Sequence, residues 1–127
     1  MLSRCRTCEQ DLPLEKFDAC KVYGVRPECK KCKCDRASII KWGATYDEMV
    51  EEYGNLCGIC LRPETVIDTR TGNVHRLCVD HDHSCCEKGC KYCRRGLLCR
   101  SCNYRLGIVE KKPGWMELAQ AYLKGGE

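Results

Sequence analysis

Apolar residues along this chain come in short runs, and each run predicts a small element rather than a large core. Residues 77–79 alternate in polarity like a half-buried β-strand, which would carry Asp80 and His81 at its end. Residues 96–98 form a second short apolar segment, and residues 17–25 predict a hairpin. The expected β-structure is therefore made of short strands.

Four segments have the composition or the periodicity of helices: residues 31–42, 45–53, 100–106 and 115–123. The second begins with the capping box Thr45-x-x-Glu48. The third lacks helix-breaking residues until Gly107, where we expect it to end. The fourth has an apolar face, which we expect to pack in the core and which consists of Trp115, Leu118, Ala119 and Tyr122.

Composition changes this picture, because the chain is too small and polar to depend on a hydrophobic core alone. It has 127 residues, of which 43% are hydrophobic and 15 are cysteines. We find no signal peptide and no membrane span, so the cytoplasm is the expected location. In that reducing compartment, an odd number of cysteines arranged mostly as C-x2-C pairs favours zinc ligation over disulfides.

Two sets of C-x2-C pairs divide the chain into two expected units. Residues 1–43 form an N-terminal zinc-ribbon-like unit with a linker helix, and its ligands are Cys5, Cys8, Cys29 and Cys32. Residues 44–127 form the second unit, in which a structural zinc is expected on Cys57, Cys60, Cys99 and Cys102. Four thiolates leave zinc no open position, so this ion would orient neighbouring residues rather than react.

A cysteine-rich insertion at residues 84–94 offers a third set, Cys85, Cys86, Cys90 and Cys93. It would raise the number of structural zinc ions from two to three. Adjacent cysteines rarely bind one ion together, so Cys78 or a histidine could replace Cys85. The alternative is a reduced loop whose free thiols are open to oxidation.

The sequence Asp80-His81-Asp82-His83 lies between the two pairs of the second set, and Asn103 directly follows the last cysteine of that set. Carboxylate and amide oxygens suit magnesium or manganese, so Asp80 and Asn103 are the expected ligands of a catalytic cation. His81 is the expected general base, since histidine has an ordinary pKa of about 6.5. His83 would assist. These side chains could alternatively form a polar loop or bind zinc themselves.

Net charge is weak evidence for a nucleic-acid partner. The formal charge is +4, but twelve thiolates on three zinc ions would bring it to about −2. Local basic clusters are more informative, although any single cluster is usually a solvated surface. The candidates for contacts with DNA phosphates are Arg94, Arg95, Arg100, Arg105, Lys30 and Lys31.

Residues 79–83, the run from Arg95 to Asn103 and the pair Leu106-Gly107 resemble the recombination endonuclease VII family, a branch of the HNH or ββα-metal nucleases found widely in bacteriophages. The resemblance covers residues 45–123. It implies a small α+β, zinc-stabilised protein with a ββα-metal (HNH-like) core and one four-cysteine zinc. It also implies DNA hydrolysis that leaves 5′-phosphate and 3′-hydroxyl ends. By position, the metal-binding residues fall on Asp80 and Asn103, the general base on His81 and the following histidine on His83.

The N-terminal unit, the insertion and the short segment after Asn103 depart from the family pattern. The expected function is a metal-dependent DNA endonuclease, a hydrolase of bacteriophage origin that acts in the host cytoplasm. It would nick DNA or recognise DNA structure. The alternatives are a non-catalytic zinc-ribbon module that binds DNA or regulates, and an accessory factor in phage DNA packaging. The partners considered are DNA, a second copy of the chain and a phage packaging protein, but no membrane.

Overall fold

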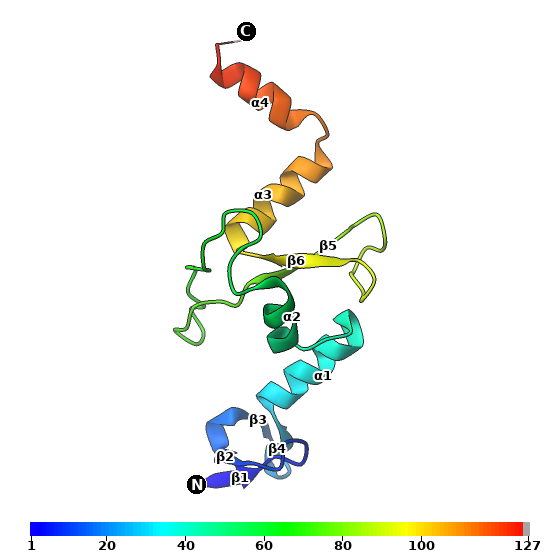
Figure 1. Cartoon of the computed structure of the whole chain (residues 1–127). Coiled ribbons are helices and arrows are strands. Elements are labelled where there is room, and N and C mark those ends of the chain that lie inside the picture. Colours follow the sequence, from blue (N-terminus) through cyan, green and yellow to red (C-terminus); the bar gives the residue numbers. More distant parts are fainter. Residues whose placement is uncertain (126–127) are drawn as a thin grey trace.

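A computed structural model describes residues 1–125 of the chain. Its hairpins and helices follow one another along an elongated molecule, with β1 near one end and α4 near the other (Figure 1). The strands pair as three antiparallel hairpins. The elements are β1 (Leu2–Arg4), β2 (Asp11–Pro13), β3 (Phe17–Cys20), β4 (Gly24–Cys29), α1 (Lys30–Trp42), α2 (Tyr46–Tyr53), β5 (Cys78–His81), β6 (Arg94–Leu98), α3 (Arg100–Lys111) and α4 (Trp115–Leu123), with a short 3-10 helix at Leu14–Lys16.

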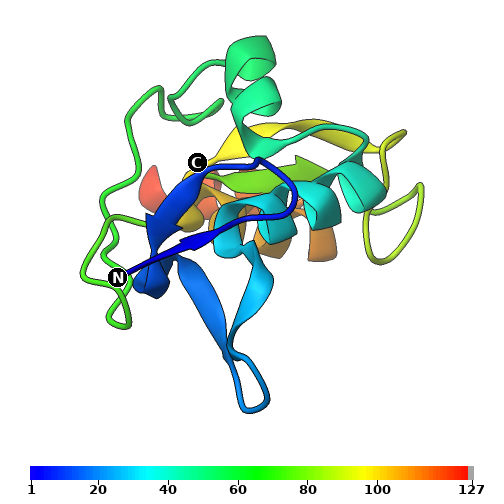
Figure 2. The same cartoon turned by 90° about the horizontal axis from the view of Figure 1, so that it is seen from below.

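The N-terminal unit consists of two hairpins around a small core of Cys5, Phe17 and Cys29. The β3–β4 hairpin confirms the prediction for residues 17–25, and it turns at Gly24 with a φ of 84°. Figure 2 shows this hairpin projecting away from the rest of the molecule. The β1–β2 hairpin was not expected, because its strands of three residues have no apolar alternation.

Helix α1 connects this unit to the rest of the chain and has no buried residue (Figure 1). Its N-cap is Cys29, whose Sγ accepts a hydrogen bond from the backbone N–H of Cys32, and its C-cap is Gly43 with a φ of 76°. The capping box predicted for α2 is confirmed, since Thr45 Oγ1 accepts from the Glu48 N–H and Glu48 Oε1 accepts from the Thr45 N–H.

A second core lies between α2 and the β5–β6 hairpin. Met49, Leu77, Leu97 and Leu98 are its largest buried side chains. Three cysteines of the second set, Cys57, Cys99 and Cys102, belong to the same cluster, whereas Cys60 is exposed. Strands β5 and β6 confirm the two predicted apolar segments. Their register shifts between Asp80 and His81, and such an irregularity re-aims the side chain that follows it.

Two helix predictions were wrong in part. Helix α3 continues through Gly107 to Lys111, because one glycine inside a helix costs only about 1 kcal/mol. Helix α4 has its predicted bounds, but its apolar face is not in the core: Leu118 is 71% exposed and Tyr122 is 82% exposed. The reason is its position beyond α3 at the end of the molecule (Figure 1). None of the described helices is long and apolar enough to cross a membrane.

Candidate active site and metal centres

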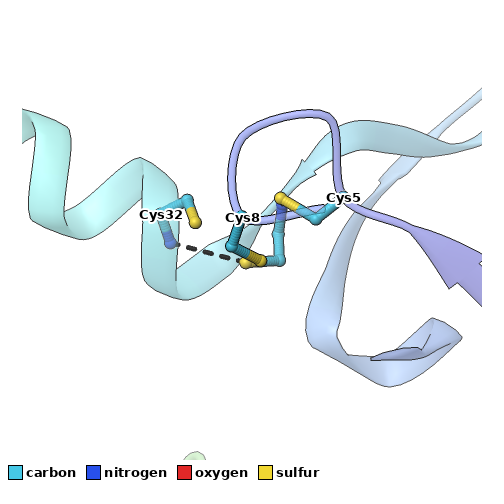
Figure 3. Close-up of side chains that lie close together, drawn as sticks. Cys5, Cys8 and Cys32 are labelled. Atoms are coloured by element: carbon cyan, nitrogen blue, oxygen red, sulfur yellow. Dashed lines mark hydrogen bonds between the residues drawn. The ribbon is translucent and has the colours of Figure 1, made fainter. Parts of the chain in front are cut away.

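Three cysteine quartets converge in residues 1–125, and each could bind one zinc ion. In the first, Cys5 and Cys8 come from the loop after β1, whereas Cys29 and Cys32 border the start of α1 (Figure 3). The backbone N–H of Cys29 donates to Cys5 Sγ at 3.3 Å, and this bond is the largest cause that lowers the pKa of Cys5 to about 6. Burial and the neighbouring sulfurs raise the pKa of Cys32 to about 12. All four sulfurs can therefore be thiolates at this spacing only when a cation lies among them.

The second quartet joins Cys57 and Cys60 to Cys99 and Cys102. Burial raises the pKa of Cys57, but backbone N–H groups oppose that effect and bring it down to about 6. Cys99 is the N-cap of α3, and its Sγ accepts from the backbone N–H of Cys102 at 3.4 Å. An ion bound here would hold the first turn of α3 in place, as the sequence predicts.

The third quartet consists of Cys85, Cys86, Cys90 and Cys93, all in the loop between β5 and β6. The alternative ligands considered from the sequence are not part of it. Cys78 lies on β5, where burial is the main cause that raises its pKa.

An open cleft of about 790 Å³ contains the candidate catalytic residues. Asp80 and His81 reach it from the end of β5, His83 from the loop that follows, and Asn103 from the first turn of α3. The structure thus brings together all four residues that the sequence selects, from segments far apart along the chain.

Asp80 is held in the cleft by an ion pair. Its side chain is only 10% exposed, and both carboxylate oxygens accept hydrogen bonds from Arg95, at 2.9 and 3.2 Å. Arg95 also donates to Glu110 at 2.7 Å, and Glu110 lies 3.1 Å from Nδ1 of His83. The bonds to Asp80 and Glu110 raise the pKa of Arg95, and the bond from Arg95 lowers the pKa of Glu110. The four side chains form one continuous polar network across the cleft.

His81 lies between two aromatic rings. Its ring centroid is 5.6 Å from that of Trp42 and 4.3 Å from that of His83. Its Nε2 is buried and has no hydrogen-bond partner among the described residues. This burial closes Nε2 to a water molecule in the cleft.

Glu110 and Trp42 were missed in the sequence. Glu110 follows Asn103 by two helical turns, so the two residues share one face of α3. The sequence contains this seven-residue spacing, but the helix was expected to end at Gly107, before Glu110. The proximity of Trp42 to His81 had no comparable signal, because it depends on how α1 meets the second unit.

The candidate DNA-binding residues differ in their exposure to solvent and in their ion pairs within the protein. Arg94 is only 18% exposed, and it donates to Glu52 and to the Tyr53 hydroxyl. Lys31 pairs with two aspartates, at 2.8 and 3.2 Å. Arg95 belongs to the cleft network, whereas the remaining candidates are exposed: Lys30, Arg100 and Arg105.

One comparison with known proteins found a match to this chain. The family model described as recombination endonuclease VII matches residues 33–125, which is most of the chain. Neither a comparison with curated proteins nor one with solved structures found a match. The matched segment includes β5, β6, α3 and both cysteine quartets beside them. The chain therefore belongs to the recombination endonuclease VII family.

Proposed function

We propose that this protein is a metal-dependent DNA endonuclease of the HNH type, which hydrolyses phosphodiester bonds at the Asp80 cleft. Family membership indicates a DNA endonuclease, and it supports the coarser part of this proposal. The observation that carries the finer part is the meeting of Asp80, His81 and Asn103 in one cleft. Strands β5 and β6 with α3 would then be the ββα-metal core.

The donor atoms of the cleft fit a hard cation. Asp80 offers a carboxylate and Asn103 an amide oxygen, and magnesium and manganese prefer such ligands together with water and phosphate oxygens. When bound, the cation would supply Lewis-acid stabilisation of charge on the phosphate. Arg95 donates one hydrogen bond to each Asp80 oxygen, and each oxygen keeps a second lone pair that a cation can use.

The histidines would take part in proton transfer, and exposed cations would bind the DNA backbone. We infer that His81 accepts the proton of the attacking water at Nδ1, since its Nε2 is covered. His83, held by Glu110, would orient the ring of His81 or contact the phosphate. Arg100, Arg105 and Lys30 are the exposed cations best placed for phosphates along the DNA backbone.

We further propose that the chain works as two zinc-centred units, residues 1–43 and 44–127, of which positions 126 and 127 lie outside the described residues. Two separate core clusters, one in each unit, support this division. An origin in a bacteriophage and action as a homodimer or with a packaging protein stay predictions from the sequence.

A non-catalytic DNA-binding module is the second candidate, and one observation favours it. Arg95 donates to both carboxylate oxygens of Asp80, as it would in a purely structural ion pair. Such a module would retain DNA without cleaving it under any cation. Its retention of DNA would also be unchanged by Asp80→Ala.

Plasmid nicking with magnesium or manganese separates the two candidates. The zinc-loaded protein should convert supercoiled DNA to the nicked form, and His81→Ala should lower the rate at least a hundredfold, the usual contribution of a general base. His75→Ala is the matched control, because His75 lies outside the cleft and should leave the rate unchanged. Equal rates for His81→Ala and the parent protein would contradict the mechanism.

A further inference from the structure

We propose that the quartet Cys85, Cys86, Cys90 and Cys93 is a zinc site that positions His81, by fixing the β5–β6 loop against Trp42. The positioning role rests on the proposed function, whereas the metal site does not. Neither the family match nor the mechanism above assigns a role to this loop.

The sulfur geometry fits a tetrahedral ion. Cys85 and Cys90 Sγ are 3.8 Å apart, Cys86 and Cys93 Sγ are 3.6 Å apart, and Cys90 and Cys93 Sγ are 3.6 Å apart. Zinc–sulfur bonds of about 2.3 Å place tetrahedral sulfurs about 3.8 Å from one another. The adjacent pair is accommodated because Cys85 faces Cys90 while Cys86 faces Cys93.

The loop has little else to hold its shape. Its side chains at Glu87, Lys88 and Tyr92 are exposed, and Cys93 is its buried residue. A loop without an apolar core needs a staple to keep one conformation. Zinc in a closed set of four thiolates supplies that staple and leaves no position for catalysis.

Hydrogen bonds connect the quartet to the catalytic strand. The backbone N–H of Asp82 donates to the Cys93 carbonyl at 2.8 Å, and the N–H of Cys85 donates to the Asp82 carbonyl at 3.1 Å. Asp82 lies between His81 and His83. Two residues of the quartet thus hold the backbone on which both cleft histidines are carried.

The same loop presses against the end of α1, which lies beside it in Figures 1 and 2. A Cβ on Gly89 would lie 2.3 Å from Cη2 of Trp42, and a Cβ on Gly43 would lie 2.9 Å from Cβ of Lys91. Gly89 also has a φ of 92°, which side-chain-bearing residues rarely adopt. The loop therefore meets the Trp42 ring closely, and that ring packs 5.6 Å from His81.

The metal site is tested by zinc content. The purified protein should carry three zinc ions per chain, one for each quartet, and Cys90→Ser should carry two. Cys34→Ser is the matched control, since Cys34 belongs to none of the quartets and should leave three. If Cys90→Ser holds as much zinc as the parent protein, the quartet is not a metal site. This result does not depend on whether the protein cuts DNA.

The positioning role is tested by Gly89→Ala, which removes no ligand. The added Cβ should displace the Trp42 ring, shift its fluorescence in a Trp115→Phe background and lower kcat about tenfold with little change in KM, while all three zinc ions stay bound. Gly72→Ala is the matched control, because Gly72 has a similar φ of 76° and no atom within 4 Å of an added Cβ. If Gly89→Ala matches Gly72→Ala in fluorescence and kcat, the loop does not position His81. The fluorescence reports on the contact even in a protein that fails to nick.

Discussion

Arg95 binds both carboxylate oxygens of Asp80, the residue expected to hold the catalytic cation. Asp80 is only 8% exposed, and its carboxylate needs a positive partner because an uncompensated charge in the interior is costly. Arg95 is that partner. It is also 40% exposed, so it can turn towards solvent or a DNA phosphate when an ion takes its place.

Arg95→Gln should therefore destabilise the ion-free cleft. We expect a loss of about 1–2 kcal/mol, less than for a fully buried pair because Arg95 is partly exposed. Manganese should raise the melting temperature of this variant more than that of the parent protein, since the cation replaces the lost charge. Thermal unfolding without chelators measures both effects. Arg105→Gln, an exposed change on the same helix, is the control, and an equal response of the two variants would rule out the pairing.

Glu110 should matter for catalysis although it was not among the predicted site residues. Glu110→Gln removes the carboxylate that holds both Arg95 and His83, and we expect kcat to fall about tenfold, as is usual for groups that orient ligands. Single-turnover nicking at saturating DNA measures the change. Glu117→Gln, on the exposed helix α4, should keep the parental rate. A parental rate for Glu110→Gln would show that the network is structural only.

The difference between Glu110 and Asn103 explains what the sequence could predict. Asn103 was found because it follows Cys102 directly, and local spacing along the chain is visible without a structure. Capping at Thr45 and the hairpin at residues 17–25 were found for the same reason. The contact of Gly89 with Trp42 depends on how distant elements pack, which periodicity does not encode.

The exposed face of α4 leads to a prediction on stability. Leu118→Ala should change the free energy of unfolding by less than about 0.5 kcal/mol, because Leu118 is 71% exposed. Leu97→Ala should cost about 2–5 kcal/mol, since Leu97 is 1% exposed and belongs to the second core. Chemical denaturation of the zinc-loaded proteins compares the two. A large loss for Leu118→Ala would mean that α4 packs in solution.

The two units should also respond separately to loss of the first metal site. Cys5→Ser removes a fully buried ligand of the N-terminal core, so amides of β1–β4 should lose protection from hydrogen exchange. Amides of β5 and β6 should keep theirs, because their core is a different cluster. Mass spectrometry of peptic fragments resolves the two regions. Loss of protection throughout the chain would show that the units fold as one.

Cys99 caps α3, and Asn103 follows the second sulfur of that turn by one residue. Successive residues of an α-helix are rotated by about 100° about the helix axis. A metal ion on the second quartet would therefore fix how far α3 is rotated about its own axis, and with it the direction in which Asn103 points. One alanine inserted after Cys102 would turn Asn103 away from Asp80 while all four sulfurs stay in place, whereas the same insertion after Lys111 would leave the angle untouched.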